Sequence, residues 1–167
     1  TLVFTNRCFI KLRDYMIRNP VVNISVQKLI KEVLTMIYYV GIDISKYKHD
    51  FCIIANTGEV IVENSSFENN KKGFQSFLEL LKPYNKSQVQ IAFEATGHYS
   101  MNLELFLIDQ GYSFIKMNPL VIHQFLKARS LRRTKTDKAD SLTIATYLMS
   151  VPYKPNSDLL YNIYTLK

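Results

Sequence analysis

The chain has 167 residues, a net charge of +7 and 47% hydrophobic residues, a composition typical of one globular domain with a buried core. Its apolar runs are shorter than the ~18 residues that span a bilayer, and its N-terminal stretch lacks the features of a secretory signal. Cys8 and Cys52 are too few and too far apart for a disulfide framework or a thiolate metal site, so we expect a protein of the reducing cytoplasm.

Residues 1–35 differ from the rest of the chain and precede Met36. They contain six Lys or Arg against two acids, and only a weak helical pattern in VQKLIKEVL. Because the apolar run IYYVGI begins directly after Met36, we interpret Met36 as the natural start and residues 1–35 as a leader of uncertain origin. An ordinary N-terminal helix is the alternative that the pattern leaves open.

From Ile37 on, hydrophobic periodicity and turn residues predict strands and helices in a regular order. Three strands come first, IYYVGIDIS, HDFCIIAN and VIVENSSF, with a hairpin turn at Asn56–Glu59 between the last two. They are followed by helix KGFQSFLELLKPY, strand QVQIAFEAT, helix SMNLELFLIDQG, strand YSFIKMN and the helices NPLVIHQFLKA and KADSLTIATYLMS. This order predicts an α/β fold in which a mixed five-stranded sheet carries helices on both faces.

Two acidic residues end strands that we expect to be neighbours. Asp43 follows the first strand and Glu94 the fourth, and alternation leaves each acid on the face opposite the apolar residues. Ligands of such sheets bind outside the carboxyl ends of the strands. The two acids are therefore candidates for one site, although a single Asp at a strand end is more often a turn or cap residue.

The stretch KTDKAD, Lys135 to Asp140, places Asp137 and Asp140 three residues apart, on one face of a helix. Four converging carboxylates repel one another unless cations lie between them, and Mg²⁺ prefers carboxylate and water oxygens. Two-metal sites for phosphoryl transfer hold their ions ~3.5–4 Å apart. The alternative for this pair is a solvated, charge-balanced helix surface.

Positive charge is concentrated next to this acidic pair. Seven Lys or Arg and one acid, Asp137, lie between Lys116 and Lys138. Such a tract is typical of proteins that bind polyanions, and also of ordinary solvated surfaces. The candidates for holding a nucleic-acid backbone are Lys127, Arg129, Arg132, Arg133, Lys135 and Lys138.

The motifs GIDISK, FEATGHY, Asn118–Pro119 and KTDKAD resemble, in order and spacing, the N-terminal domain of the DEDD transposases of bacterial insertion sequences, the IS110 type. This family includes site-specific DNA invertases, and the resemblance covers Met36 to about Lys167. It implies a ribonuclease H-like fold similar to RuvC, the Holliday-junction resolvase, with residues 36–150 as the catalytic domain. It also implies a catalytic tetrad that binds Mg²⁺, with Mn²⁺ as a substitute, formed by Asp43, Glu94, Asp137 and Asp140.

The same resemblance implies DNA as a partner and, for some members, a guide RNA encoded in the element. A full-length member is expected to be a homo-oligomer in the bacterial cytoplasm. Family members carry a second, C-terminal domain with a serine that attacks DNA, and we interpret residues 151–167 as the start of a truncated segment connecting to it. We therefore expect this chain to bind metal and nucleic acid without completing strand exchange by itself.

Two other functions stay open at this point. A non-catalytic nucleic-acid-binding module would carry the same basic tract, with acids that are only structural. A fragment of an actin-like ATPase or sugar kinase would also open with a Gly-Ile-Asp strand and a hairpin. Those proteins place a glycine-rich phosphate loop after the aspartate, and Ser45–Lys48 contains no glycine.

Overall fold

The structure is a computed structural model that describes residues 24–94, 97–129 and 140–155. The chain divides into two units at the boundary between Met36 and Ile37. In the first unit, α2 (Ile24–Leu34) is a helix at the position of the weak helical pattern. Thr35 follows the helix, and its amide and hydroxyl both donate to carbonyl oxygens of the last helical turn.

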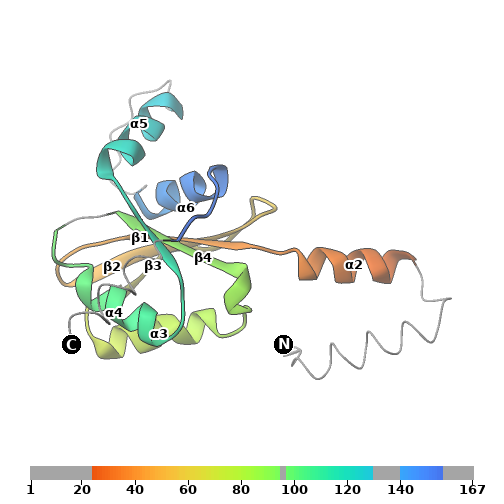
Figure 1. The fold of residues 1–167 in the computed structure, drawn as a ribbon, viewed down its shortest axis with the longest axis horizontal. Helices are drawn as coiled ribbons and strands as arrows, with labels where there is room; N and C mark the ends of the chain where they lie inside the picture. The colour runs from red at the N-terminus through yellow and green to blue at the C-terminus, as the bar shows by residue number, and fades with distance from the viewer. Residues whose placement is uncertain (1–23, 95–96, 130–139, 156–167) are drawn as a thin grey trace. The chain divides into compact units, whose positions relative to one another are not determined.

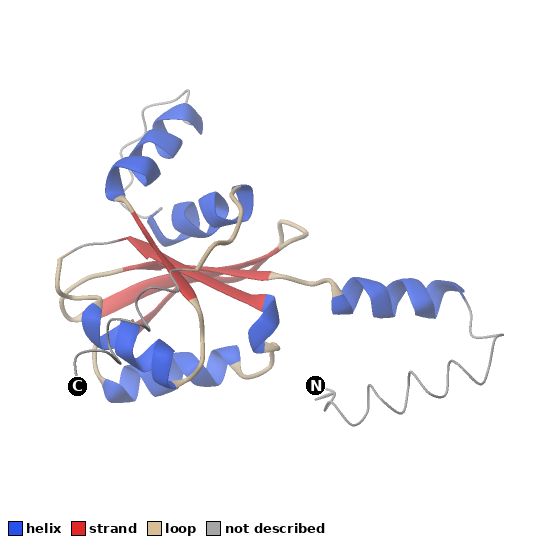
Figure 2. Ribbon diagram, viewed as in Figure 1, coloured by secondary structure: helices blue, strands red, loops and turns tan. Residues whose placement is uncertain are grey.

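The second unit is built on a five-stranded sheet in the order β3–β2–β1–β4–β5 (Figures 1 and 2). Its strands are β1 (Tyr38–Asp43), β2 (Lys48–Ala55), β3 (Val60–Glu68), β4 (Val89–Glu94) and β5 (Phe114–Met117). β2 is antiparallel to both β1 and β3, whereas β1, β4 and β5 are parallel. This mixed sheet confirms the α/β class and the five strands that the sequence predicts.

Helices cover both faces of the sheet, as the element order predicts. α3 (Lys71–Leu81) and α4 (Met101–Asp109) lie on one face, and α6 (Asp140–Ser150) lies on the other (Figure 1). α5 (Pro119–Arg129) packs beside α6, where the rings of Phe125 and Tyr147 meet edge to face with centroids 5.0 Å apart. A short 3-10 helix, Lys86–Gln88, precedes β4.

The main core lies between the sheet and the pair α3 and α4. Ile42 on β1 and Phe93 on β4 are fully buried on this face. They join a cluster of aromatic side chains in which the rings of Phe67 and Phe77 stack with centroids 4.4 Å apart. Burial of apolar strand faces and aromatic rings is the main stabilising term for such a domain.

Local signals end the elements where the sequence predicts. Gly58 has a φ of +87° in the hairpin turn, and Gly111 has a φ of +69° just after α4. Asn118 begins α5, because its side-chain oxygen accepts a hydrogen bond of 2.9 Å from the amide of Leu120. Glycine and asparagine stand at these positions because few other residues adopt such backbones or cap a helix.

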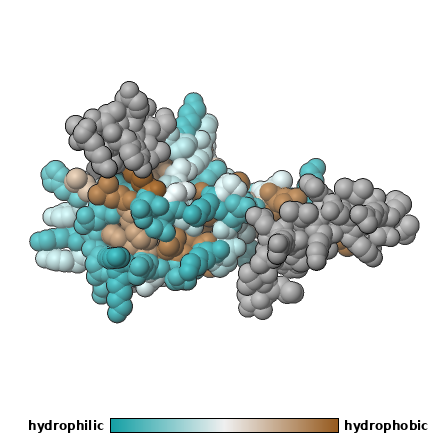
Figure 3. Space-filling model, turned by 60° about the horizontal axis from the view of Figure 1, so that its bottom comes forward, coloured by the Kyte–Doolittle hydropathy of each residue, from teal (hydrophilic) through white to brown (hydrophobic). Residues whose placement is uncertain are grey.

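In the view that brings the side of α3 and α4 forward, hydrophobic patches lie between hydrophilic side chains (Figure 3). Leu80 on α3 and Met101 and Leu105 on α4 are about half exposed. Among the residues that the structure describes, no helix has both the length and the hydropathy needed to cross a membrane.

The opposite face of the sheet packs closely against α6, and this approach depends on Gly41. A Cβ added to Gly41 would lie far inside contact distance of the Ser141 carbonyl oxygen and the Ala145 amide. Both obstacles are backbone atoms, so no side chain can move aside. Ile144 and Leu148, farther along α6, are fully buried in a second hydrophobic cluster on this face.

We predict that Gly41→Ala lowers the free energy of unfolding by about 1–3 kcal/mol, because α6 must shift away from β1. Urea unfolding followed by circular dichroism measures this change. Gly58→Asn is the matched control, since a Cβ at Gly58 meets nothing within 4 Å and asparagine tolerates a positive φ. Equal stability of Gly41→Ala and the unmodified chain would contradict the close packing of α6.

Candidate functional site

Asp43 and Glu94 end neighbouring parallel strands at one edge of the sheet. Ile42 on β1 pairs with Phe93 on β4, so Asp43 and Glu94 come next to each other at the strand ends. Both acidic side chains are half-buried. Because Ile42 and Phe93 point into the main core, alternation directs the two acids to the face that α6 covers.

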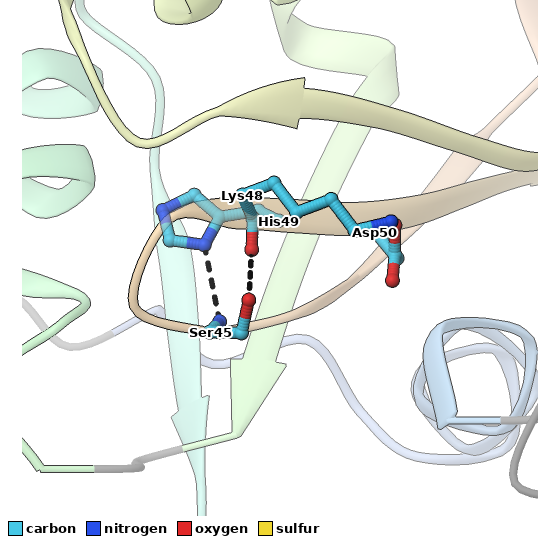
Figure 4. A network of polar contacts seen from close by, with 4 residues as sticks. All are labelled: Ser45, Lys48, His49 and Asp50. Atoms are coloured by element: carbon cyan, nitrogen blue, oxygen red, sulfur yellow. Dashed lines mark hydrogen bonds and ion pairs between the residues drawn. The ribbon is translucent and has the colours of Figure 1, made fainter.

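A third acidic residue, Asp50 on β2, lies across from Asp43. The antiparallel register pairs the two residues directly, so their side chains share one face. Asp50 is half-buried, and its carboxylate oxygen lies 3.0 Å from the Nζ of Lys48 (Figure 4). Asp50 is not among the site residues predicted from the sequence. The signal that could have found it is the pair of acids flanking the short loop between the first two strands.

The N-terminal end of α6 points toward the same edge. The backbone of Ser141 abuts Gly41, two residues before Asp43 on the same face of β1. Tyr39, nearer the start of β1, packs instead against the cluster that contains the later turns of α6. α6 therefore runs opposite to β1, and its first residue, Asp140, lies toward the carboxyl end of that strand (Figure 1).

The structure places the other predicted site residues only in part. Lys127 is exposed on α5, and Arg129 and Asp140 are placed by their backbones at the end of α5 and the start of α6. The remaining candidates, which lie outside the described residues, are Arg132, Arg133, Lys135, Asp137 and Lys138. Within the described ranges, no group of three or more His, Cys, Asp and Glu is arranged to hold a metal ion. The convergence of all four acids therefore stays a prediction.

The cysteine and the histidine near this edge are not available as metal ligands, because the Cys52 thiol is protonated and His49 lies on the other face of the sheet. Cys52 is fully buried under α6, and burial together with the charge of Glu63 raises the pKa of its thiol to about 11. Such a thiol is not a thiolate at neutral pH. His49 is fully buried on the other face, between the rings of Phe67 and Phe74. Among the described residues the edge thus offers carboxylate oxygens, the ligands that Mg²⁺ prefers.

The loop after β1 is held by polar contacts with His49 and Lys48. The Ser45 amide donates to His49 Nδ1 over 3.3 Å, and the Ser45 hydroxyl donates to the Lys48 carbonyl oxygen (Figure 4). Burial lowers the pKa of His49, against the opposing effects of Asn69 and Asp50. A neutral imidazole keeps Nδ1 free to accept the Ser45 hydrogen bond. Sequence reasoning found no partner pattern for His49.

The segment after Glu94 leads into α4, whose start is tied to β5. Ser100 is buried at this point, and its hydroxyl donates to Glu104 Oε1 over 2.6 Å. The same oxygen lies 2.8 Å from Lys116 Nζ on β5. Because Glu104 is buried, loss of Lys116 would leave a charge without its ion-pair partner in the interior. This contact fixes the chain downstream of Glu94.

Comparisons with known proteins identify relatives of this chain. The family model of the IS110-type DEDD transposases, described as transposase, matches residues 40–161, which is more than half of the chain. Two curated relatives are the pilin gene-inverting proteins of Moraxella bovis and Moraxella lacunata, which are 37% and 36% identical over 111 residues. The aligned part is 65% of this chain and 33% of each relative, so the chain spans about a third of their length.

Two solved structures of Thermus thermophilus RuvC are more distantly similar. The structure in complex with Holliday junction substrate has a TM-score of 0.46 and 14% identity, over 71% of this chain and 99% of that one. The second structure has a TM-score of 0.47 and 12% identity, and the match covers 72% of this chain and 99% of that one. The match of the family model over residues 40–161 shows that this chain belongs to the DEDD transposases of the IS110 type.

Proposed function

We propose that residues 37–155 form the carboxylate-bearing domain of a DNA recombinase, which binds a divalent cation at Asp43 and Glu94 and holds DNA beside it. The observation that carries this proposal is the pairing of β1 with β4, which ends two neighbouring strands in acids. Family membership supplies the reaction class, and Asp137 and Asp140 would complete the site.

Mg²⁺ is the cation that these residues fit best. Carboxylate and water oxygens are its preferred ligands, and Mn²⁺ accepts the same donors. When bound, Mg²⁺ would stabilise the charge on the entering and leaving oxygens of a phosphodiester. Asp43 and Glu94 would contribute ligand charge from strand ends, which hold their spacing more rigidly than loops do.

DNA is the partner that the charge distribution supports. Met117 pairs with Glu94 at the end of β5, and α5 with the exposed Lys127 begins two residues later. Lys and Arg side chains bind the phosphate backbone and release its counterions. We propose that the residues of the basic tract contact the DNA phosphate backbone and would equally hold a guide RNA. These residues are Lys127, Arg129, Arg132, Arg133, Lys135 and Lys138.

The names of the curated relatives describe the inversion of a gene, which is a rearrangement of DNA. Because this chain spans about a third of those proteins, strand exchange is proposed for a whole protein of that kind. For the chain itself, the proposed activities are binding of metal and of DNA. A non-catalytic nucleic-acid-binding module shares the basic tract, and only the metal distinguishes the two functions.

We expect Asp43→Asn and Glu94→Gln each to weaken Mn²⁺ binding, because each removes a charged ligand. The loss should exceed the about 10- to 100-fold loss of affinity that follows when a residue supporting a ligand is replaced. In the absence of metal, both variants should melt at a higher temperature, since the repulsion between the carboxylates is relieved. Calorimetric titration measures the affinity and a thermal scan measures the melting temperature.

Asp109→Asn is the control, because Asp109 is exposed at the end of α4. It should leave Mn²⁺ affinity unchanged. If both site variants fold and bind Mn²⁺ as tightly as the unmodified chain, the proposed metal site at Asp43 and Glu94 is wrong. The alternative function, a non-catalytic nucleic-acid-binding module, is then favoured.

The double variant Lys127→Glu and Arg133→Glu should bind a mixed-sequence DNA duplex more weakly. The slope of log affinity against log salt should fall by about 2, since each lost phosphate contact removes about 0.9 from it. Fluorescence anisotropy over a salt series measures both quantities, and an RNA duplex in a parallel series tests the guide-RNA proposal.

The matched control is Lys82→Glu with Lys86→Glu, which changes the net charge equally beyond the C-terminal end of α3. It should retain most of the salt slope. Equal losses of slope in the two double variants would show that binding follows net charge alone, against a specific role of the basic tract.

A further inference from the structure

One side chain joins the two loops that begin at the candidate metal ligands, although it belongs to neither loop. Asn69, which follows β3, is half-buried. Its amide nitrogen donates to the carbonyl oxygens of Lys46 and Tyr99, each over 3.2 Å. Lys46 lies in the loop that follows Asp43, and Tyr99 lies in the segment that follows Glu94. A single amide group thus links the two segments.

Asn69 is also fixed to the first loop through its backbone, because its own N–H donates to the Tyr47 carbonyl oxygen over 2.8 Å. The residue therefore contacts the loop after β1 twice, through its backbone and through its side chain. Its side-chain link to Tyr99 is the contact that extends this attachment to the segment after β4.

His49 lies close to the side chain of Asn69. The side-chain oxygen of Asn69 and Nε2 of His49 are buried, and neither makes a hydrogen bond with any described residue. Asn69 nevertheless acts on the His49 pKa in the direction expected of a hydrogen-bond acceptor. The side chains of Asn69 and His49 are therefore neighbours.

The imidazole of His49 is held in one orientation from three sides. Its Nδ1 accepts from the Ser45 amide over 3.3 Å. Phe67 meets it edge to face and Phe74 lies parallel to it, with ring centroids 5.3 and 6.2 Å away. Polar contacts thus join Ser45 to His49, and they join Asn69, its neighbour, to both loops.

We infer that Asn69 is a positioning residue that sets the separation of the Asp43 and Glu94 segments and thereby the affinity of the metal site. The inference rests on the proposed function, since it concerns the same two carboxylates. Mg²⁺ demands near-ideal octahedral geometry, so small changes in ligand spacing reduce its binding. Residues that orient metal ligands from outside typically change affinity by about 10- to 100-fold when they are replaced.

Asn69→Asp is the test variant, because it replaces the donating NH₂ group with an oxygen of similar size. Both hydrogen bonds to the loop carbonyls are lost while the volume is kept. The Mn²⁺ affinity of the full chain should fall about 10- to 100-fold in calorimetric titration, with Mg²⁺ falling in parallel. The added negative charge alone would strengthen cation binding, so it cannot cause this loss.

Asn70→Ala is the matched control for a purely structural effect. Asn70 caps α3 by accepting the Gly73 amide over 2.9 Å, and its side chain contacts Glu68 within the same segment. Losing this cap lowers stability. Because Asn70 makes no side-chain hydrogen bond to either loop among the described residues, Mn²⁺ affinity should stay unchanged.

Three outcomes separate this inference from the proposed function. If Asp43→Asn loses Mn²⁺ and Asn69→Asp does not, the positioning role is wrong and the metal site stands. If Asn69→Asp and Asn70→Ala lose affinity alike, the effect is one of stability and the positioning role is again wrong. If Asp43→Asn binds Mn²⁺ normally, the proposed metal site itself fails.

Should Asn69→Asp not fold, as judged by circular dichroism, Asn69→Ala replaces it as the test. It removes the same two hydrogen bonds to the loop carbonyls without adding a charge. A several-fold loss of Mn²⁺ affinity in this variant would support the inference, and unchanged affinity would overturn it.

Discussion

The parallel pairing of β1 with β4 is the constraint on which the rest of the domain depends. Its register buries Ile42 and Phe93 in the main core and, one residue later, leaves Asp43 and Glu94 at the edge on the other face. Because side chains alternate along a strand, a slip of one residue would exchange the buried and the polar positions. The same pairing therefore specifies both the hydrophobic core and the candidate site.

This arrangement brings two carboxylates to neighbouring strand ends, and like charges held close together would cost stability unless a cation bound between them. Several contacts hold the strand ends in place against this repulsion. Gly41 admits α6 against the sheet, the Lys48–Asp50 ion pair neutralises a third acid, and Asn69 bridges the two loops. A bound cation would add stability by mass action, because it binds the folded chain and not the unfolded one.

Much of this fold could be predicted from local signals. Alternation located the strands, and the structure confirms the hairpin turn predicted at Asn56–Glu59, where Gly58 has a positive φ. The opposition of Asp50 to Asp43 could not be predicted from periodicity, because it depends on the register between two strands. The contacts of His49 and Asn69 could not be predicted either, since tertiary packing brings together residues that are twenty positions apart.

The most direct test of the metal site is a crystal structure of the chain grown with Mn²⁺, whose anomalous scattering locates each ion. We predict an ion in contact with both Asp43 and Glu94, with Asp137 and Asp140 as further ligands, and a spacing of ~3.5–4 Å if two ions bind. An ion bound elsewhere, or no ion at this edge at saturating Mn²⁺, would show that Asp43 and Glu94 do not form a metal site.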